Sequence, residues 1–223
     1  MARNNSRMLT EFESKELLKK AGIPIVATKL AKSADEAVIL SRELGFPVAL
    51  KINSVDVVHK SDAGGIKLNL NSGRAVSRAY NEIISAVKKK YPDANVQGVS
   101  VQKMAPPGTE VIIGMTRDAQ FGPVIMFGLG GVLVELLKDV SFRVVPLDTK
   151  DAESMIKEVK GYPLLAGYRG RDAVSMSALT DIIVKLSQFV EKNPQIKELD
   201  LNPVLAYRDS ALAVDARVLI DVP

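Results

Sequence analysis

Two segments near the N-terminus carry the signature of a helix start, and this signature sets the first constraint on the fold. Residues 10–13 (TEFE) and 33–36 (SADE) both have the Ser/Thr-x-x-Glu form of a capping box, in which the hydroxyl and the glutamate each bind a backbone amide. Gly22 and Gly45 follow at the spacing of a helix end, where glycine is favoured. The pattern predicts one helix that ends near Gly22 and another that stops at Gly45.

Apolar segments follow these helices in a strand-like pattern, so helices and strands alternate along the chain. Residues 47–52 have the pattern of a buried strand, 66–70 alternate between apolar and polar, and Ser72 suits the cap of a helix that reaches the lysines 88–90. Further strands are expected at 25–30, 99–104, 110–116, 122–127, 143–147, 196–202, 204–207 and 211–215, and further helices at 150–159 and 172–191. This alternation predicts an α/β or α+β fold with two lobes that meet near 102–107.

Composition narrows the class of protein. The chain has 223 residues, 47% hydrophobic and 25% charged, which is typical of a soluble globular protein with one large core or two small ones. It has no uncharged apolar stretch near the ~20 residues that span a membrane, and its N-terminus lacks the apolar core of a signal peptide, so we expect a cytoplasmic location. The absence of cysteine excludes disulfides, thiol catalysis and thiolate metal sites.

The charge pattern argues against a nucleic-acid partner. The 30 basic and 26 acidic residues are interspersed, and the one lysine run, 88–90, follows a helical pattern in which cations suit the helix end. The chain has no tryptophan, and its few aromatic residues show no stacking pattern for single strands.

The only histidine, His59, lies in a polar loop between two predicted strands. Lys51 lies inside an apolar strand and must therefore reach water or an anion. Lys60 flanks the histidine, and the pair Gly64-Gly65 allows backbone amides to approach a phosphate closely. The pattern favours a phosphate-binding loop, although an edge lysine whose ammonium reaches solvent and an ordinary glycine turn also account for it. His59 is then either a nucleophile toward phosphorus or a structural loop residue.

Two common nucleotide-binding motifs are missing. No Gly-x-x-x-x-Gly-Lys-Ser/Thr sequence occurs, which excludes a P-loop. The run 128–131 (GLGG) follows an apolar strand but does not continue as Gly-x-Gly-x-x-Gly, so a Rossmann dinucleotide site is disfavoured.

A third cluster lies near the C-terminus. Asp200 and Asn202 are two residues apart, so both point to one side of an extended strand, and Asp215 ends a strand that a short connection can bring alongside. Two carboxylates and an amide oxygen suit magnesium, which takes phosphate oxygens as further ligands. Polar residues that form turns at strand ends are the alternative.

The segments 50–52 (LKI), 59–65 (HKSDAGG) and 198–203 (ELDLNP) together resemble the ATP-grasp β subunit of ADP-forming acetyl-CoA synthetases. They are similar, more distantly, to the ATP-binding part of the succinyl-CoA synthetase β subunit. The resemblance covers the chain from about Thr10 to its end. It implies an ATP-grasp fold of two α+β lobes with the nucleotide site between them. The implied domains are an N-terminal helix (1–21) packed on the second lobe, a first lobe (22–101), and a hinge strand with the second lobe (102–223).

The resemblance also implies a role for each matching residue. It assigns the phosphates of ATP or ADP to Lys51, Gly64 and Gly65. It assigns the adenine to Gln102, Lys103 and Met104 of the hinge strand. It assigns the ribose to Glu110, and Mg²⁺ to Asn202 and Asp215. Asp200 matches a carboxylate beside the phosphorylated histidine, although succinyl-CoA synthetases have glutamate there. His59 matches the second active-site histidine, which accepts phosphate next to ADP.

The implied function is that of an enzyme subunit. The chain contains no Gly-x-Gly-x-x-Gly pattern of a CoA-binding fold, so acyl-CoA and phosphate are expected to bind an α subunit, in a hetero-oligomer of the α2β2 type. The reaction would be acyl-CoA + ADP + phosphate giving acid + CoA + ATP. Two alternatives remain open at this point: a different ATP-grasp carboxylate ligase that acts alone, and a non-catalytic nucleotide-binding regulatory subunit.

Overall fold

The computed structural model describes residues 6–57, 59–131, 138–170 and 172–222, and their contacts divide the chain into two units. The smaller unit comprises Thr10–Glu13 and Val26–Pro106, and the larger unit comprises the other described residues. Strand β5 (Gly98–Lys103), which crosses the expected domain boundary at 101/102, lies wholly in the smaller unit. Residues 1–5, in the N-terminal stretch for which the sequence predicts no signal peptide, lie outside the described residues.

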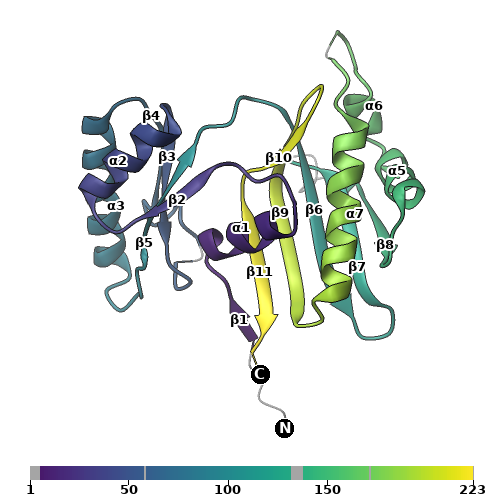
Figure 1. The fold of residues 1–223 in the computed structure, drawn as a ribbon, viewed down its shortest axis with the longest axis horizontal. Coiled ribbons are helices and arrows are strands. Elements are labelled where there is room, and N and C mark those ends of the chain that lie inside the picture. Colours follow the sequence, from purple (N-terminus) through teal and green to yellow (C-terminus); the bar gives the residue numbers. More distant parts are fainter. Residues whose placement is uncertain (1–5, 58, 132–137, 171, 223) are drawn as a thin grey trace. The chain divides into compact units, whose positions relative to one another are not determined.

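The smaller unit is a four-stranded antiparallel sheet covered by two helices (Figure 1). The strand order is β2 (Thr28–Ala31), β5, β3 (Val48–Asn53) and β4 (Ile66–Leu70), and the helices are α2 (Ala34–Leu44) and α3 (Gly73–Lys90). The helices pack on each other and on the sheet. Val48, Leu50 and Ile52 of β3 point into this core, so the residues between them face the other side of the sheet.

The helix-start predictions hold in most details. Helix α1 (Glu11–Lys20) begins with a complete capping box, because the Thr10 amide donates to Glu13 Oε2 (2.8 Å) and the Glu13 amide donates to Thr10 Oγ1 (3.3 Å). In α2 the Ser33 cap is present, but the Glu36 carboxylate accepts from the Lys32 amide (2.7 Å) instead of closing a box on Ser33. The predicted end of α2 at Gly45 and the Ser72 cap of α3 are confirmed.

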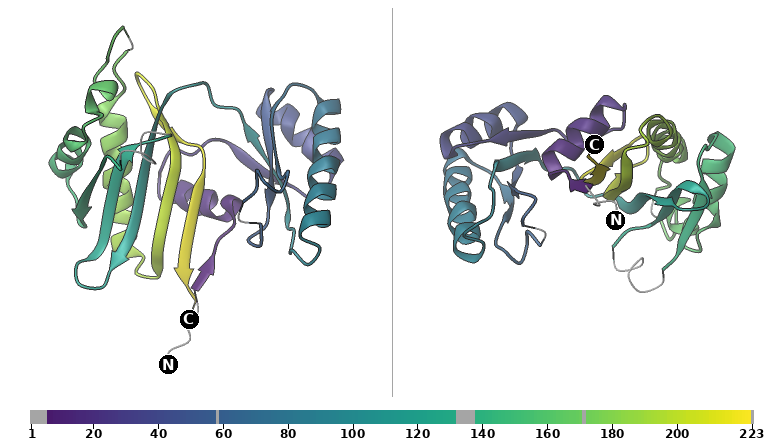
Figure 2. Two further views of the ribbon diagram at one scale, coloured as in Figure 1. Left: turned by 180° about the vertical axis from the view of Figure 1, so that it is seen from behind. Right: turned by 90° about the horizontal axis from the view of Figure 1, so that it is seen from below.

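The larger unit is a seven-stranded antiparallel sheet. Its strand order is β1 (Ser6–Met8), β11 (Ala216–Asp221), β9 (Ile196–Ala206), β6 (Thr109–Asp118), β7 (Gly122–Leu129) and β8 (Val140–Val144), with β10 (Ala211–Ala213) paired to β9. Helices α5 (Thr149–Glu158) and α7 (Met176–Lys192) lie against one face, and a short helix α6 (Tyr162–Leu165) follows α5. Seen from behind, the strands stand in front of these helices, so this face carries no helix among the described residues (Figure 2).

Strand alternation separates the two faces of the larger sheet. Leu199 and Leu201 of β9 and Val218 of β11 are buried in the core under the helices. Asp200 and Arg217 therefore lie on the uncovered face, where polar side chains can reach solvent. This face therefore holds Asp200, one of the three residues of the predicted acidic cluster (Asp200, Asn202 and Asp215).

Several predicted boundaries were wrong for identifiable reasons. The expected strands 196–202 and 204–207 are one strand, β9, because a bulge opposite Ile112 accommodates Pro203, which has no amide to donate. The strand expected at 211–215 ends at Ala213, and β11 after it was not predicted.

Other differences are shifts of a few residues. The helix expected at 172–191 begins at Met176 after a Ser175 cap, and the strand expected at 143–147 lies at Val140–Val144. The strand expected at 25–30 is shorter, Thr28–Ala31, with Ile25 in an isolated bridge to Ala213. Among the described residues no helix is both long and apolar enough to cross a membrane.

Candidate functional site

The predicted phosphate lysines meet a carboxylate of their own unit. Lys51 points away from the core on β3, and its Nζ lies 2.8 Å from Glu11 Oε1. Lys60 Nζ lies 2.6 Å from Glu11 Oε2. The three side chains are 8%, 15% and 2% exposed, in the order Lys51, Lys60 and Glu11. A lysine on a buried strand needs an anion, and in this structure Glu11, in the first turn of α1, supplies one.

The loop that carries His59 is closed by its own backbone. The Gly65 amide donates to the Lys60 carbonyl (2.8 Å) and the Gly64 amide to the Ser61 carbonyl (3.0 Å), the pattern of a Schellman turn. Gly64 has a φ of +66°, and a Cβ on Gly65 would come within 2.7 Å of Ile52 Cγ2. The glycines are therefore needed to shape the loop. Their backbone N–H groups donate to carbonyls of the loop itself. His59 itself is exposed.

The three predicted adenine-lining residues form the end of β5 and the segment after it. Gln102 is 3% exposed, and the Met104 amide donates to the Pro47 carbonyl (3.1 Å). Lys103 Nζ donates to the carbonyls of Gly45 (2.7 Å) and Phe46 (3.2 Å). The Lys103 ammonium thus binds two backbone carbonyls directly after α2, so its predicted contact with the nucleotide would be shared with this segment.

Glu110 lies near the start of β6, is exposed, and lines a cavity of about 800 Å³ in the larger unit. The glycine run 128–131 lies against it. The Gly130 amide donates to the Glu110 carbonyl (2.7 Å), and a Cβ on Gly130 would come within 2.8 Å of Glu110 Cβ. This run is therefore explained by close packing of β7 on β6, and not by a dinucleotide turn.

The predicted magnesium ligands lie together in the larger unit. The Asn202 amide donates to the Asp215 carbonyl (3.3 Å), and Asp215 Oδ1 accepts from the Ala216 amide (2.8 Å). Asp200 lies two residues before Asn202 on β9 and pairs in register with Arg217 of β11. The short connection between the strands brings Asp215 back alongside β9, as the sequence predicted.

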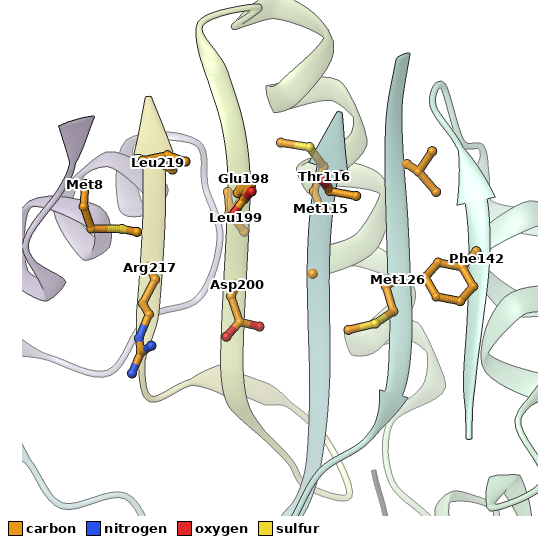
Figure 3. A pocket seen from close by; sticks show the side chains of 12 residues that line it. Met8, Met115, Thr116, Met126, Phe142, Glu198, Leu199, Asp200, Arg217 and Leu219 are labelled. Atoms are coloured by element: carbon orange, nitrogen blue, oxygen red, sulfur yellow. The ribbon is translucent and has the colours of Figure 1, made fainter. Parts of the chain in front are cut away.

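Asp200 and Arg217 line a cavity of about 490 Å³ on the uncovered face of the sheet. Figure 3 shows the two side chains on adjacent strands, with Met126 and Phe142 on the far side of the cavity. Burial raises the pKa of Asp200; Arg217 lowers it in part, and Asp215 raises it further. The cavity is mainly apolar, with its charged groups on β9 and β11.

The residues of the acidic cluster fit a magnesium ion by the chemistry of their donors. Within the described residues no three histidine, cysteine or acidic side chains form a complete metal cage. Magnesium rarely needs one, because it is commonly held by one or two carboxylates with water and phosphate oxygens. A carboxylate from Asp215 and an amide oxygen from Asn202 match that partial donor set.

The sequence did not identify two residues of these clusters. Glu11 was read only as part of a capping box, since a helix-start pattern does not show which first-turn side chain is buried. Arg217 was missed because β11 was missed, although the alternation in 216–219 (ARVL) was the available signal.

Comparisons with known proteins identify close relatives. The sequence matches a family model described as an ATP-grasp domain over residues 1–220. It is 50% identical, over 98% of this chain and 94% of the relative, to the β subunit of acetate–CoA ligase [ADP-forming] I of Pyrococcus furiosus.

Solved structures from Ca. Korarchaeum cryptofilum have the same fold. One is dinucleotide forming acetyl-coenzyme A synthetase 1 in complex with coenzyme A and Ca-AMPCP; its TM-score is 0.93 and its identity 54%, with 96% of this chain and 93% of that chain covered. Another contains coenzyme A and Mg-AMPPCP, with a phosphohistidine segment pointing towards the nucleotide binding site; its TM-score is 0.85 and its identity 50%, covering 96% of this chain and 92% of that chain.

Proposed function

Because this chain belongs to the ATP-grasp family, we propose that it is the nucleotide-binding β subunit of an ADP-forming acetyl-CoA synthetase. It is a ligase subunit that transfers a phosphoryl group between a phosphohistidine and ADP or ATP. The observation that carries the assignment is the exposed His59 beside the buried cluster of Lys51, Lys60 and Glu11. It is supported by the similarity to such a β subunit along nearly the whole chain.

His59 is the proposed phosphoryl acceptor. A neutral imidazole nitrogen attacks phosphorus, the new N–P bond forms, and the bond to the donor imidazole of the partner breaks. An ADP β-phosphate oxygen then attacks the same phosphorus, which forms ATP and returns the neutral imidazole of His59. Lys51 and Lys60 neutralise part of the negative charge of the transferring group, which is the main contribution that a protein makes to phosphoryl transfer.

The remaining predicted residues hold the nucleotide in this proposal. Gln102, Lys103 and Met104 contact the base, and Glu110 contacts the ribose. Asn202 and Asp215 would hold Mg²⁺, which supplies positive charge to the phosphates when bound. Asp200, beside Arg217, would orient the imidazole of the phosphorylated histidine.

The partner is proposed to be an α subunit that carries the CoA-binding and acyl phosphate chemistry, in an α2β2 assembly in the cytoplasm. The name of the Pyrococcus relative, a β subunit, supports a partner of this kind. The net reaction is acyl-CoA + ADP + phosphate giving acid + CoA + ATP.

The deciding experiment mixes this chain with its α subunit, acetyl-CoA, ADP and labelled phosphate. We expect ATP to form and an acid-labile, base-stable phosphate to appear on this chain, where His59 is the only histidine. The variant His59→Asn keeps a hydrogen-bonding group but lacks the nucleophile, so ATP formation should fall by at least ~10³-fold while ADP still binds.

The other outcomes identify the alternatives. ATP-dependent activation of a carboxylate by this chain alone would indicate a different ATP-grasp ligase. Nucleotide binding with full activity of His59→Asn, or with no labelled phosphate on the chain, would contradict the proposed transfer through His59.

A further inference from the structure

One carboxylate binds both lysines of the smaller unit, and nothing in the proposed transfer reaction uses it. Glu11 Oε1 accepts from Lys51 on β3 (2.8 Å), and Glu11 Oε2 accepts from Lys60 in the loop (2.6 Å). The Glu11 side chain is 2% exposed. We propose that Glu11 is a positioning residue, which holds Lys51 and Lys60 together and thereby fixes the loop that carries His59.

The position of Glu11 is itself well determined. The capping box of Thr10 and Glu13 begins α1, and the Phe12 amide donates to Asn53 Oδ1 (3.4 Å) at the end of β3. The first turn of the helix is therefore attached to the same strand that carries Lys51. These contacts order the backbone at Glu11, so the entropy that remains to be lost when its carboxylate binds the lysines is that of the Glu11 side chain alone.

The contact with Lys60 extends this order to the histidine. Lys60 is bound at both ends, because its ammonium donates to Glu11 and its carbonyl accepts from the Gly65 amide (2.8 Å). His59 is the next residue, and its carbonyl accepts from the Ala63 amide (3.2 Å). Loss of the Glu11 charge would leave two buried ammonium groups close together, and Lys60, the more exposed of the two, would move toward solvent and loosen the turn.

The functional part of this inference rests on the proposed function: a loosened loop should hold His59 less well in place for phosphoryl transfer. The geometric part can be tested without any ligand. Amide hydrogen exchange of Ala63, Gly64 and Gly65 reports directly on the turn that Lys60 closes.

The test compares Glu11→Gln with Glu13→Gln in the full chain. Both remove a carboxylate from the first turn of α1, but only Glu11 binds Lys60. We expect the three loop amides to exchange roughly tenfold faster or more in Glu11→Gln, as loss of a charge-assisted contact worth ~1.5–3 kcal/mol implies, and no faster in Glu13→Gln. In the assembled enzyme Glu11→Gln should lower kcat and the labelled phosphate on His59, with a smaller change in the KM for ADP.

If Glu11→Gln is poorly stable, the single variant Lys60→Gln tests the same contact; where both variants fold, a double-mutant cycle joins them. Lys60→Gln alone should also speed exchange of the three amides. The double variant should exchange no faster than the faster single variant, because each single variant already removes the Glu11–Lys60 contact. Additive effects, or equal exchange in Glu11→Gln and Glu13→Gln, would overturn the inference. If exchange changes as expected while the wild-type chain takes up no phosphate, the positioning role stands and the proposed function fails.

Discussion

The smaller unit buries the charged residues of its proposed site and pairs them with each other, whereas the larger unit presents the charged residues of its proposed site on an open sheet face. Lys51, Lys60 and Glu11 form a closed cluster with both carboxylate oxygens occupied. In the larger unit, Asn202 and Arg217 are exposed, and Asp200 and Asp215 are partly exposed.

The difference follows from what each unit is proposed to bind. Buried lysines must be compensated when no ligand is present, and a fixed carboxylate does this without leaving an uncompensated charge in the core. Carboxylates that are to bind a hydrated cation must instead stay accessible, since magnesium keeps several of its waters. The comparison predicts that substitutions in the smaller unit affect folding strongly and those in the larger unit affect ligand binding first.

The largest effect is expected for Lys51→Met, which keeps the length of the side chain but removes its charge. Glu11 then loses one of its two lysines inside a buried cluster. Breaking a buried ion pair on one side costs about 3 kcal/mol or more, so the free energy of unfolding should fall by roughly that amount. Urea denaturation without nucleotide measures it, and affinity for ADP should also fall about tenfold through loss of a phosphate contact.

Lys67→Met is the matched control in the same sheet. Lys67 Nζ lies 2.8 Å from Glu82 Oε2, but the two side chains are 40% and 47% exposed. An exposed pair of this kind contributes little to stability. Equal losses of stability in the two variants would remove the distinction between a buried and an exposed lysine on which the comparison depends.

How far the sequence could predict these two regions differs as well. Lys51 and His59 could be selected because a lysine in an apolar strand and a lone histidine beside glycines are conspicuous in the sequence itself. Glu11 could not, because its role depends on contacts between residues 40 and 49 positions apart, which no local pattern records. The spacing of two predicts that Asp200 and Asn202 share one strand face, and both residues lie on β9. Arg217 lies opposite Asp200 only through the register of β9 and β11, which becomes known once the sheet is assembled.

A smaller effect, confined to ligand binding, is expected for Asp215→Asn. The amide oxygen can still accept from the Ala216 amide, so the turn and the stability of the free chain should be kept. Loss of the negative charge should weaken Mg²⁺, so that about tenfold more magnesium is needed to reach the same rise in melting temperature with ADP, a change of about 1.4 kcal/mol.

Asp221→Asn on β11 serves as the control for that variant. Asp221 is an acidic residue at the far end of the strand that Asp215 precedes, and its carboxylate lies 2.8 Å from Lys197 Nζ. Its replacement should leave the magnesium dependence unchanged. A magnesium requirement that is the same in wild type and Asp215→Asn would rule out Asp215 as a ligand.

The smallest effect concerns the pH dependence of stability. Removing a charge should destabilise the smaller unit at Lys51, but should stabilise the larger unit at Asp200. Burial raises the pKa of Asp200 in the folded chain above its ordinary value of 3.8. The folded state therefore holds this proton to higher pH than the unfolded state does, and stability falls as pH rises between the two pKa values. Above the folded pKa the ionised Asp200 destabilises the chain in full, and below 3.8 it does not.

Asp200→Asn should therefore be more stable than the wild type near neutral pH in the absence of metal, and the difference should shrink as the solution is made acidic. The gain should be smaller than the loss in Lys51→Met, because Asp200 is only partly buried and Arg217 already offsets some of the cost. Glu198→Gln, an exposed position on the same face of β9, is the control and should show no such gain. If Asp200→Asn instead loses stability at neutral pH, the Asp200 carboxylate is compensated by Arg217 as fully as the lysines are by Glu11, and the contrast between the two regions fails.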